Sequence, residues 1–250
     1  MPKLLALTAA LLLTAPMAVQ AEPTRVMVRA QALDAKFIGD HMGGVAITLK
    51  DTRTGAVLAR GLTRGGTGDT QRIMRAPRTR GDGVTDAATA GFEAVLDLKA
   101  PTLVRAEAEG PMGKPGSAIR VASSLWIIPG HDVLGDGWIL TLPGLVVEPS
   151  ASTSVDGEVT LTAKVALMCG CPIESGGLWD AANYTVQARL TRKGRLAADI
   201  PLAFTGRTGE YAATTPKLAP GRYVLRVVAM DAKTANAGMF EWKITVGARP

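Results

Sequence analysis

The decapeptide EVTLTAKVAL at positions 158–167 decides the fold class of this chain. Its odd-numbered positions are apolar: Val159, Leu161, Ala163, Val165 and Leu167. Its even-numbered positions up to 164 are polar: Glu158, Thr160, Thr162 and Lys164. Alternation with a period of two residues predicts an antiparallel strand with one buried face and one solvated face.

The same alternation recurs on the C-terminal side of this decapeptide. Residues 184–190 and 240–246 repeat it, and a turn at Lys193-Gly194 leads into a further alternating run at 196–204. Turn-forming residues separate the runs at the spacing typical of a sandwich, and helix-period segments are scarce. We therefore expect an all-β fold with two antiparallel, immunoglobulin-like β-sandwich modules.

Composition suggests where the two modules meet. Residues 149–154 form a short segment rich in Pro, Ser and Thr. This connector predicts an N-terminal module at 23–147, which includes a long loop at 64–91. It predicts a C-terminal module at 152–248, which carries a Cys-Gly-Cys segment. Because the connector is short, a fixed or hinged pair is favoured over freely moving modules.

Two stretches resemble known module types. Residues 218–231, LAPGRYVLRVVAMD, resemble the Pro-Gly-x-Tyr approach to a late strand in bacterial immunoglobulin-like and fibronectin-like sandwiches. The resemblance implies that the Tyr223 hydroxyl pins a corner by bonding to nearby backbone. Residues 44–63, GVAITLKDTRTGAVLARGLT, resemble the opening hairpin of transthyretin-like modules, with the turn at Thr54-Gly55. Both resemblances concern the fold and imply no activity.

The N-terminus is typical of a secretory signal peptide. Lys3 is followed by an apolar run at 4–19, and Ala21 stands at the expected cleavage position. Cleavage after residue 21 leaves a mature chain that begins at Glu22 and is exported to the periplasm. No later segment is long and apolar enough to span a membrane. Removal of residues 1–21 takes away one Lys and no acid, so the formal net charge falls from +6 to +5.

Charge and motif content argue against several functional classes. Basic and acidic residues are interspersed, and the interleaved aromatic and basic residues of single-strand binders are missing, so no nucleic acid partner is expected. The two histidines, His41 and His131, both lie in predicted loops. No metalloprotease, Gly-x-Ser-x-Gly or phosphate-loop motif occurs. We expect no catalytic residue and no cofactor.

One segment nevertheless carries sulfur chemistry: Met168-Cys169-Gly170-Cys171-Pro172. Gly170 is free to adopt a positive φ and Pro172 ends the ladder, so the two sulfurs can converge. The first interpretation is a local disulfide between Cys169 and Cys171 in an oxidising compartment. The second is a Cu(I) site formed by both cysteines and the Met168 thioether. The third is thiol–disulfide exchange at the pair.

The 64–91 loop holds a concentration of arginines: Arg72, Arg75, Arg78 and Arg80. Ile73 and Met74 are expected to be exposed between them. Long loops on rigid sheets often bind partners, although a mobile, solvated tip is an equally good interpretation. Trp179, near the cysteines, is either a hydrophobic anchor for a partner or a core residue.

These features predict an exported, non-catalytic binding or accessory protein of the cell envelope. Its expected partner is another envelope protein, met through the 64–91 loop or the 168–180 segment. The alternative is a periplasmic copper-handling or thiol-redox protein that uses Cys169 and Cys171.

Overall fold

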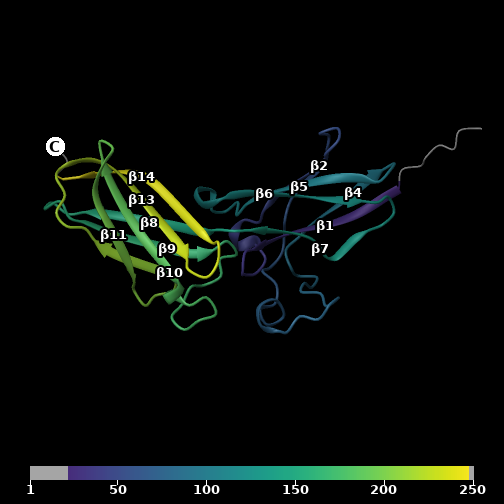
Figure 1. Cartoon of the computed structure of the whole chain (residues 1–250), viewed down its shortest axis with the longest axis horizontal. Helices are drawn as coiled ribbons and strands as arrows, with labels where there is room; N and C mark the ends of the chain where they lie inside the picture. The colour runs from purple at the N-terminus through teal and green to yellow at the C-terminus, as the bar shows by residue number, and fades with distance from the viewer. Residues whose placement is uncertain (1–21, 248–250) are drawn as a thin grey trace, which may run out of the picture.

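The protein, described here from a computed structural model, consists of two β-sandwiches placed end to end (Figure 1). The structure describes residues 22–247, so the predicted signal peptide and the predicted limit at 248 lie outside the described residues. Strands dominate both halves of the described chain, which confirms the expected all-β class. The short helical segments are one-turn elements in loops.

The N-terminal sandwich contains the first seven strands. They are β1 (Glu22–Ala32), β2 (Ala46–Asp51), β3 (Val57–Leu62), β4 (Phe92–Leu98), β5 (Thr102–Gly110), β6 (Ile119–Ile127) and β7 (Val133–Leu142). One sheet has the order β4-β1-β7 and the other has the order β3-β2-β5-β6. The first strand runs parallel to the last, and the other pairs are antiparallel.

The C-terminal sandwich contains the remaining strands. They are β8 (Leu145–Thr153), β9 (Val159–Leu167), β10 (Tyr184–Arg192), β11 (Arg195–Phe204), β12 (Glu210–Thr214), β13 (Gly221–Asp231) and β14 (Ala237–Val246). Their hydrogen-bonded order is β14-β13-β10-β11-β12-β9-β8. β11 pairs with β10 along most of its length and with β12 at its end, so it passes from one layer to the other. This order is that of an immunoglobulin-like sandwich.

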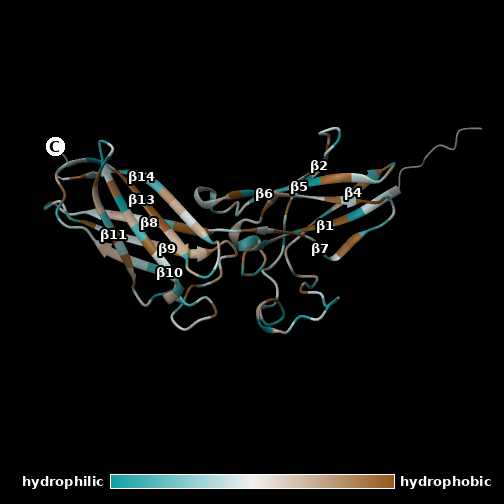
Figure 2. Ribbon diagram, in the orientation of Figure 1, coloured by the Kyte–Doolittle hydropathy of each residue, from teal (hydrophilic) through white to brown (hydrophobic). Residues whose placement is uncertain are grey.

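Several local predictions are confirmed. β9 has the alternating burial that the sequence indicated, and hydrophobic and hydrophilic residues alternate along several strands in Figure 2. The β2–β3 hairpin turns at Gly55, whose φ is +74°, and Lys193 and Gly194 both have positive φ in the β10–β11 turn. The Tyr223 hydroxyl donates a 2.7 Å hydrogen bond to the Ala219 carbonyl, so this tyrosine is a packing and corner residue.

The predicted connector is instead part of a strand. Residues 149–153 continue β8 and pair with β9, and the Ser150 and Thr162 hydroxyl groups are 2.6 Å apart. Pro149 is tolerated because β8 lies at the end of the strand order, where a proline need not donate to a neighbour. The two sets of strands therefore meet at Pro143-Gly144, between β7 and β8.

Alternation overstated the burial of β11. Leu196 is 59% exposed, whereas Leu202 in the same alternating set is 5% exposed. Burial along β11 therefore increases from its start toward its end, with Ala198 and Ile200 partly buried between these two leucines.

Candidate functional site

The Cys-Gly-Cys segment forms a tight turn directly after β9. A disulfide joins Cys169 and Cys171, whose Cα atoms are 5.3 Å apart. Gly170 has a φ of +71°, and its amide donates to the Leu167 carbonyl at 2.8 Å. Both cysteines are buried. The bonded, buried state agrees with the first interpretation of the pair, a local disulfide.

The turn packs against the N-terminal sandwich. The segment η1 (Asp40–Met42) lies beside Gly170: a β-carbon on this glycine would be 2.6 Å from His41 Nε2 and 2.8 Å from Met42 Sδ. Position 170 therefore requires glycine for two reasons: its φ is positive, and a β-carbon there would clash with η1. The sequence paired neither His41 nor Met42 with the cysteines, because the contact depends on how the two sandwiches dock.

Met168 packs where the two sandwiches join. Its terminal methyl packs at Gly144, between β7 and β8, and the residue is 1% exposed. Within residues 22–247, no three His, Cys, Asp or Glu side chains gather in a way that could hold a metal ion. Met168, Cys169 and Cys171 are all buried, and the sulfur atoms of the two cysteines are joined in the disulfide, so the Cu(I) site stays a prediction.

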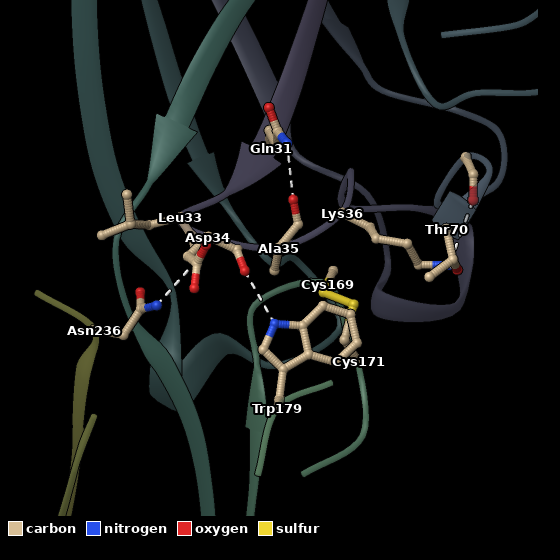
Figure 3. Close-up of a disulfide and its surroundings, with 11 residues drawn as sticks. Gln31, Leu33, Asp34, Ala35, Lys36, Thr70, Cys169, Cys171, Trp179 and Asn236 are labelled. Atoms are coloured by element: carbon tan, nitrogen blue, oxygen red, sulfur yellow. Dashed lines mark hydrogen bonds between the residues drawn. A yellow bond between two sulfur atoms is a disulfide. The ribbon is translucent and has the colours of Figure 1, made fainter. Parts of the chain in front are cut away.

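Trp179 is buried and is not a free anchor for a partner. It is 7% exposed, and its indole Nε1 donates a 3.0 Å hydrogen bond to the Asp34 carbonyl of the N-terminal sandwich. Figure 3 shows its ring beside the disulfide. Of the two interpretations of Trp179, the core residue is correct, because the ring fills the junction between the sandwiches.

Further polar contacts hold the junction. The buried Asn236 side chain, in the β13–β14 turn, donates to the Leu33 carbonyl at 2.9 Å and accepts from the Gly144 amide at 2.7 Å. Lys114 and Glu148 form a 2.7 Å ion pair across the same junction. The buried apolar residues of both sandwiches also form one continuous cluster. The sequence suggested either a fixed or a hinged pair of modules, and these contacts correspond to a fixed pair.

The arginine loop, residues 64–91, is the second candidate site. It projects from the N-terminal sandwich as the blue loop at the bottom of Figure 1. The π-helical turn η2 (Gln71–Arg75) lies within it. Ile73 is 4% exposed and packs with Phe37 and Val84, and Met74 is half-buried against this small cluster. The expectation that Ile73 and Met74 are exposed is therefore wrong, since they attach the loop to the sheet.

A carboxylate also fixes the loop. Asp136, on β7, accepts hydrogen bonds from the Val84 amide at 2.9 Å and from the Thr85 amide and hydroxyl at 2.9 and 2.7 Å. Burial raises the pKa of Asp136, but these hydrogen bonds and the nearby charge of Arg29 outweigh it and lower the pKa below its ordinary value. This anchoring role of Asp136 depends on a contact between residues far apart in the chain, so the sequence pattern did not predict it.

The four predicted arginines divide into two pairs. Arg72 donates to the Thr85 carbonyl at 3.0 Å and Arg78 to the Ile73 carbonyl at 3.1 Å, so both brace the loop. Arg75 and Arg80 are exposed, and neither side chain makes a hydrogen bond or ion pair with residues 22–247. No acidic residue lies between Asp69 and Asp82. All four arginines are exposed on one loop, and only Arg75 and Arg80 have side chains without a hydrogen bond or ion pair among residues 22–247.

The two histidines occupy different places. His41 is exposed at the junction, whereas His131 lies in the β6–β7 turn near the start of β1. Neither lies in a cluster of potential His, Cys, Asp or Glu metal ligands among the described residues.

Among residues 22–247, no helix has the length and apolar character needed to cross a membrane.

Comparisons with known proteins leave the family open. No protein-family model and no curated protein matches the chain. A solved structure of a DUF3823 family protein from Bacteroides ovatus is similar at 12% identity and a TM-score of 0.31, covering 89% of this chain and 98% of that one. The chicken interferon gamma receptor alpha chain is similar at 10% identity and a TM-score of 0.35, covering 92% and 100%. Titin domains Z1Z2, solved in complex with telethonin, give 9% identity, a TM-score of 0.21, and coverage of 92% and 91%. With scores this low, the sandwich assignment rests on the strand pairing itself.

Proposed function

We propose that this chain is an exported, non-catalytic binding protein of the cell envelope, and that the arginine loop binds an acidic surface of another envelope protein. The observation that carries the proposal is the order of the loop. Ile73 and Asp136 fix it to the sheet, so Arg75 and Arg80 are held out to solvent. A preorganised loop loses less conformational entropy when it binds than a mobile one.

Guanidinium groups suit this role. Each presents a planar set of donors that can bind a carboxylate in a bidentate manner, and the charge remains at any physiological pH. Arg75 and Arg80 have no acidic partner within the described chain to satisfy them. Complementary charge accelerates association and selects the partner, and both effects weaken as salt rises.

The test is capture of envelope proteins by the mature chain and by the Arg75→Gln/Arg80→Gln variant. The matched control is Arg53→Gln/Arg195→Gln, which removes the same charge from exposed arginines outside the loop. We expect the loop variant to lose a salt-sensitive partner that the wild type and the control retain. Equal capture by all three proteins would refute the role of the loop.

Export is part of the proposal and rests on the N-terminal sequence pattern. The mature protein is expected in the periplasm, beginning at Glu22. N-terminal sequencing of protein recovered from the periplasm checks this. An intact N-terminus in the cytoplasmic fraction would contradict it.

Copper handling or thiol-redox chemistry is the second candidate, and one observation favours it. His41 Nε2 and Met42 Sδ lie beside Gly170, so two further soft or borderline donors are close to the cysteines. Copper binding would require reduction of the disulfide, which frees both thiols. We rank this candidate second because the pair is bonded and buried.

The Cys169→Ser/Cys171→Ser variant separates the two candidates. If the disulfide only staples the turn, the variant keeps partner capture and loses about 1–2 kcal/mol of unfolding free energy, as expected for a very short loop. Metal content of reduced protein, measured by native mass spectrometry with added Cu(I), provides the second comparison. Stoichiometric copper that disappears in the variant would favour the metal function.

A further inference from the structure

A cleft of about 320 Å³ lies between the two sandwiches, beside the Cys-Gly-Cys turn. Its apolar side includes Met42 from the N-terminal sandwich and Val146, Ala166 and Ile173 from the C-terminal one. Val146 on β8 and Ala166 on β9 are cross-strand partners, so they lie side by side in the same sheet. Volumes near this size and apolar walls with a few polar groups are typical of small-molecule sites.

Some charged groups at the cleft form ion pairs and one does not. Lys114 and Glu148 form the ion pair that crosses the junction. Lys164 also lines the cleft and lies opposite Glu148 and Glu210 in the strand register. Glu210 is bound to Arg207 at 2.6 Å. Among residues 22–247, Lys164 itself makes no ion pair within 4.0 Å, so it is an available positive charge at the edge of an apolar cleft.

We propose that this cleft binds a small amphipathic carboxylate, with its apolar tail against Val146 and Ala166 and its carboxylate at the Lys164 ammonium. His41, which is exposed and also lines the cleft, supplies a further polar contact, whereas the Thr208 hydroxyl is already bound to Glu174 at 2.9 Å. The inference is independent of the arginine loop. Residues of both sandwiches line the cleft, so the site exists only because the two sandwiches are docked against each other.

The experiment titrates the mature chain with sodium octanoate and follows backbone amide shifts by NMR, with 1-octanol and octylammonium as probes of the same tail length. We expect saturable amide shifts at residues 146, 166, 170, 171 and 173 with octanoate, and weaker binding of the other two probes. Lys164→Gln should weaken octanoate binding about tenfold, as expected for loss of one charge-assisted hydrogen bond.

Two variants complete the design. Ala166→Phe places a ring in the cleft and should abolish binding, with thermal unfolding recorded to confirm that the variant folds. Lys193→Gln removes an equally exposed charge from the distal β10–β11 turn and should bind octanoate as the wild type does. Shifts that spread over the outer sheet faces, or equal affinity for 1-octanol, or an unchanged affinity in Lys164→Gln, would each overturn the proposal.

Discussion

Gly170 shows how much one residue position can contribute to the junction. Its φ of +71° is close to the +74° of Gly55, but the two glycines have different surroundings. A β-carbon at position 170 would meet His41 and Met42, whereas one at position 55 would have nothing within 4 Å. The pair therefore separates the cost of a positive φ from the cost of disturbing the contact between the sandwiches.

We predict that Gly170→Ala lowers the unfolding free energy by about 2–4 kcal/mol, because a left-handed conformation and a steric clash add together. Gly55→Ala should cost only about 1 kcal/mol, the conformational part alone. Urea denaturation of both variants measures the difference. Similar losses in the two variants would show that Gly170 is not pressed between the sandwiches.

Residue-level chemistry in the sequence identified the sulfur segment but not its neighbours. Glycine between two cysteines and proline after them indicated a turn with converging sulfurs, and the disulfide agrees with this. The roles of Trp179, His41 and Met42 depend on contacts between residues far apart in the chain. No local pattern carries that information, so the sequence alone does not distinguish a core role of Trp179 from a partner-binding one.

At the scale of elements, the arginine loop depends on Asp136. Its pKa is lowered in the folded chain, so its contribution to holding the loop is present above the ordinary range of an aspartate and is lost as pH falls through the lower, folded value. Asp86, in the same loop, has a lowered pKa too, mainly because the Thr89 hydroxyl donates to it. Both carboxylates therefore stabilise the loop at neutral pH.

We predict that the Val84 and Thr85 amide signals move together as pH falls below about 4, because protonation weakens their bonds to Asp136. The strands should keep their chemical shifts through that change. In Asp136→Asn the coupled movement at these two amides should be absent, since the residue no longer titrates. An unchanged pH profile in the variant would assign the movement to Asp86 or to global unfolding.

Strand positions were predictable from alternation because one face of each strand is buried and the other is solvated. β9 and β10 are clear examples, with alternating burial along their length. The connector was not predictable from composition, because Pro, Ser and Thr also suit an edge strand that packs on one face only. Ile73 was predicted to be exposed but is buried, because a single apolar residue within a polar loop has no periodicity from which its burial could be inferred.

At the scale of the whole molecule, the two sandwiches form one body. The Trp179–Asp34 and Asn236–Leu33 hydrogen bonds and the Lys114–Glu148 ion pair cross the junction, next to the disulfide-bonded turn. The arginine loop lies on the N-terminal sandwich and the cleft lies between the two. The two surfaces proposed for binding therefore lie on different parts of the molecule, one on the loop and one at the junction.

The most direct test of the arginine loop as the partner surface is site-specific photo-crosslinking in intact cells. A photoreactive amino acid replaces Thr79, which is exposed between Arg78 and Arg80, and a control chain carries it at the exposed Leu196 of the other sandwich. The account predicts one abundant crosslinked envelope protein from position 79, absent from position 196 and lost in the Arg75→Gln/Arg80→Gln background. A crosslinked product that persists in that background, or that forms equally from position 196, would contradict it.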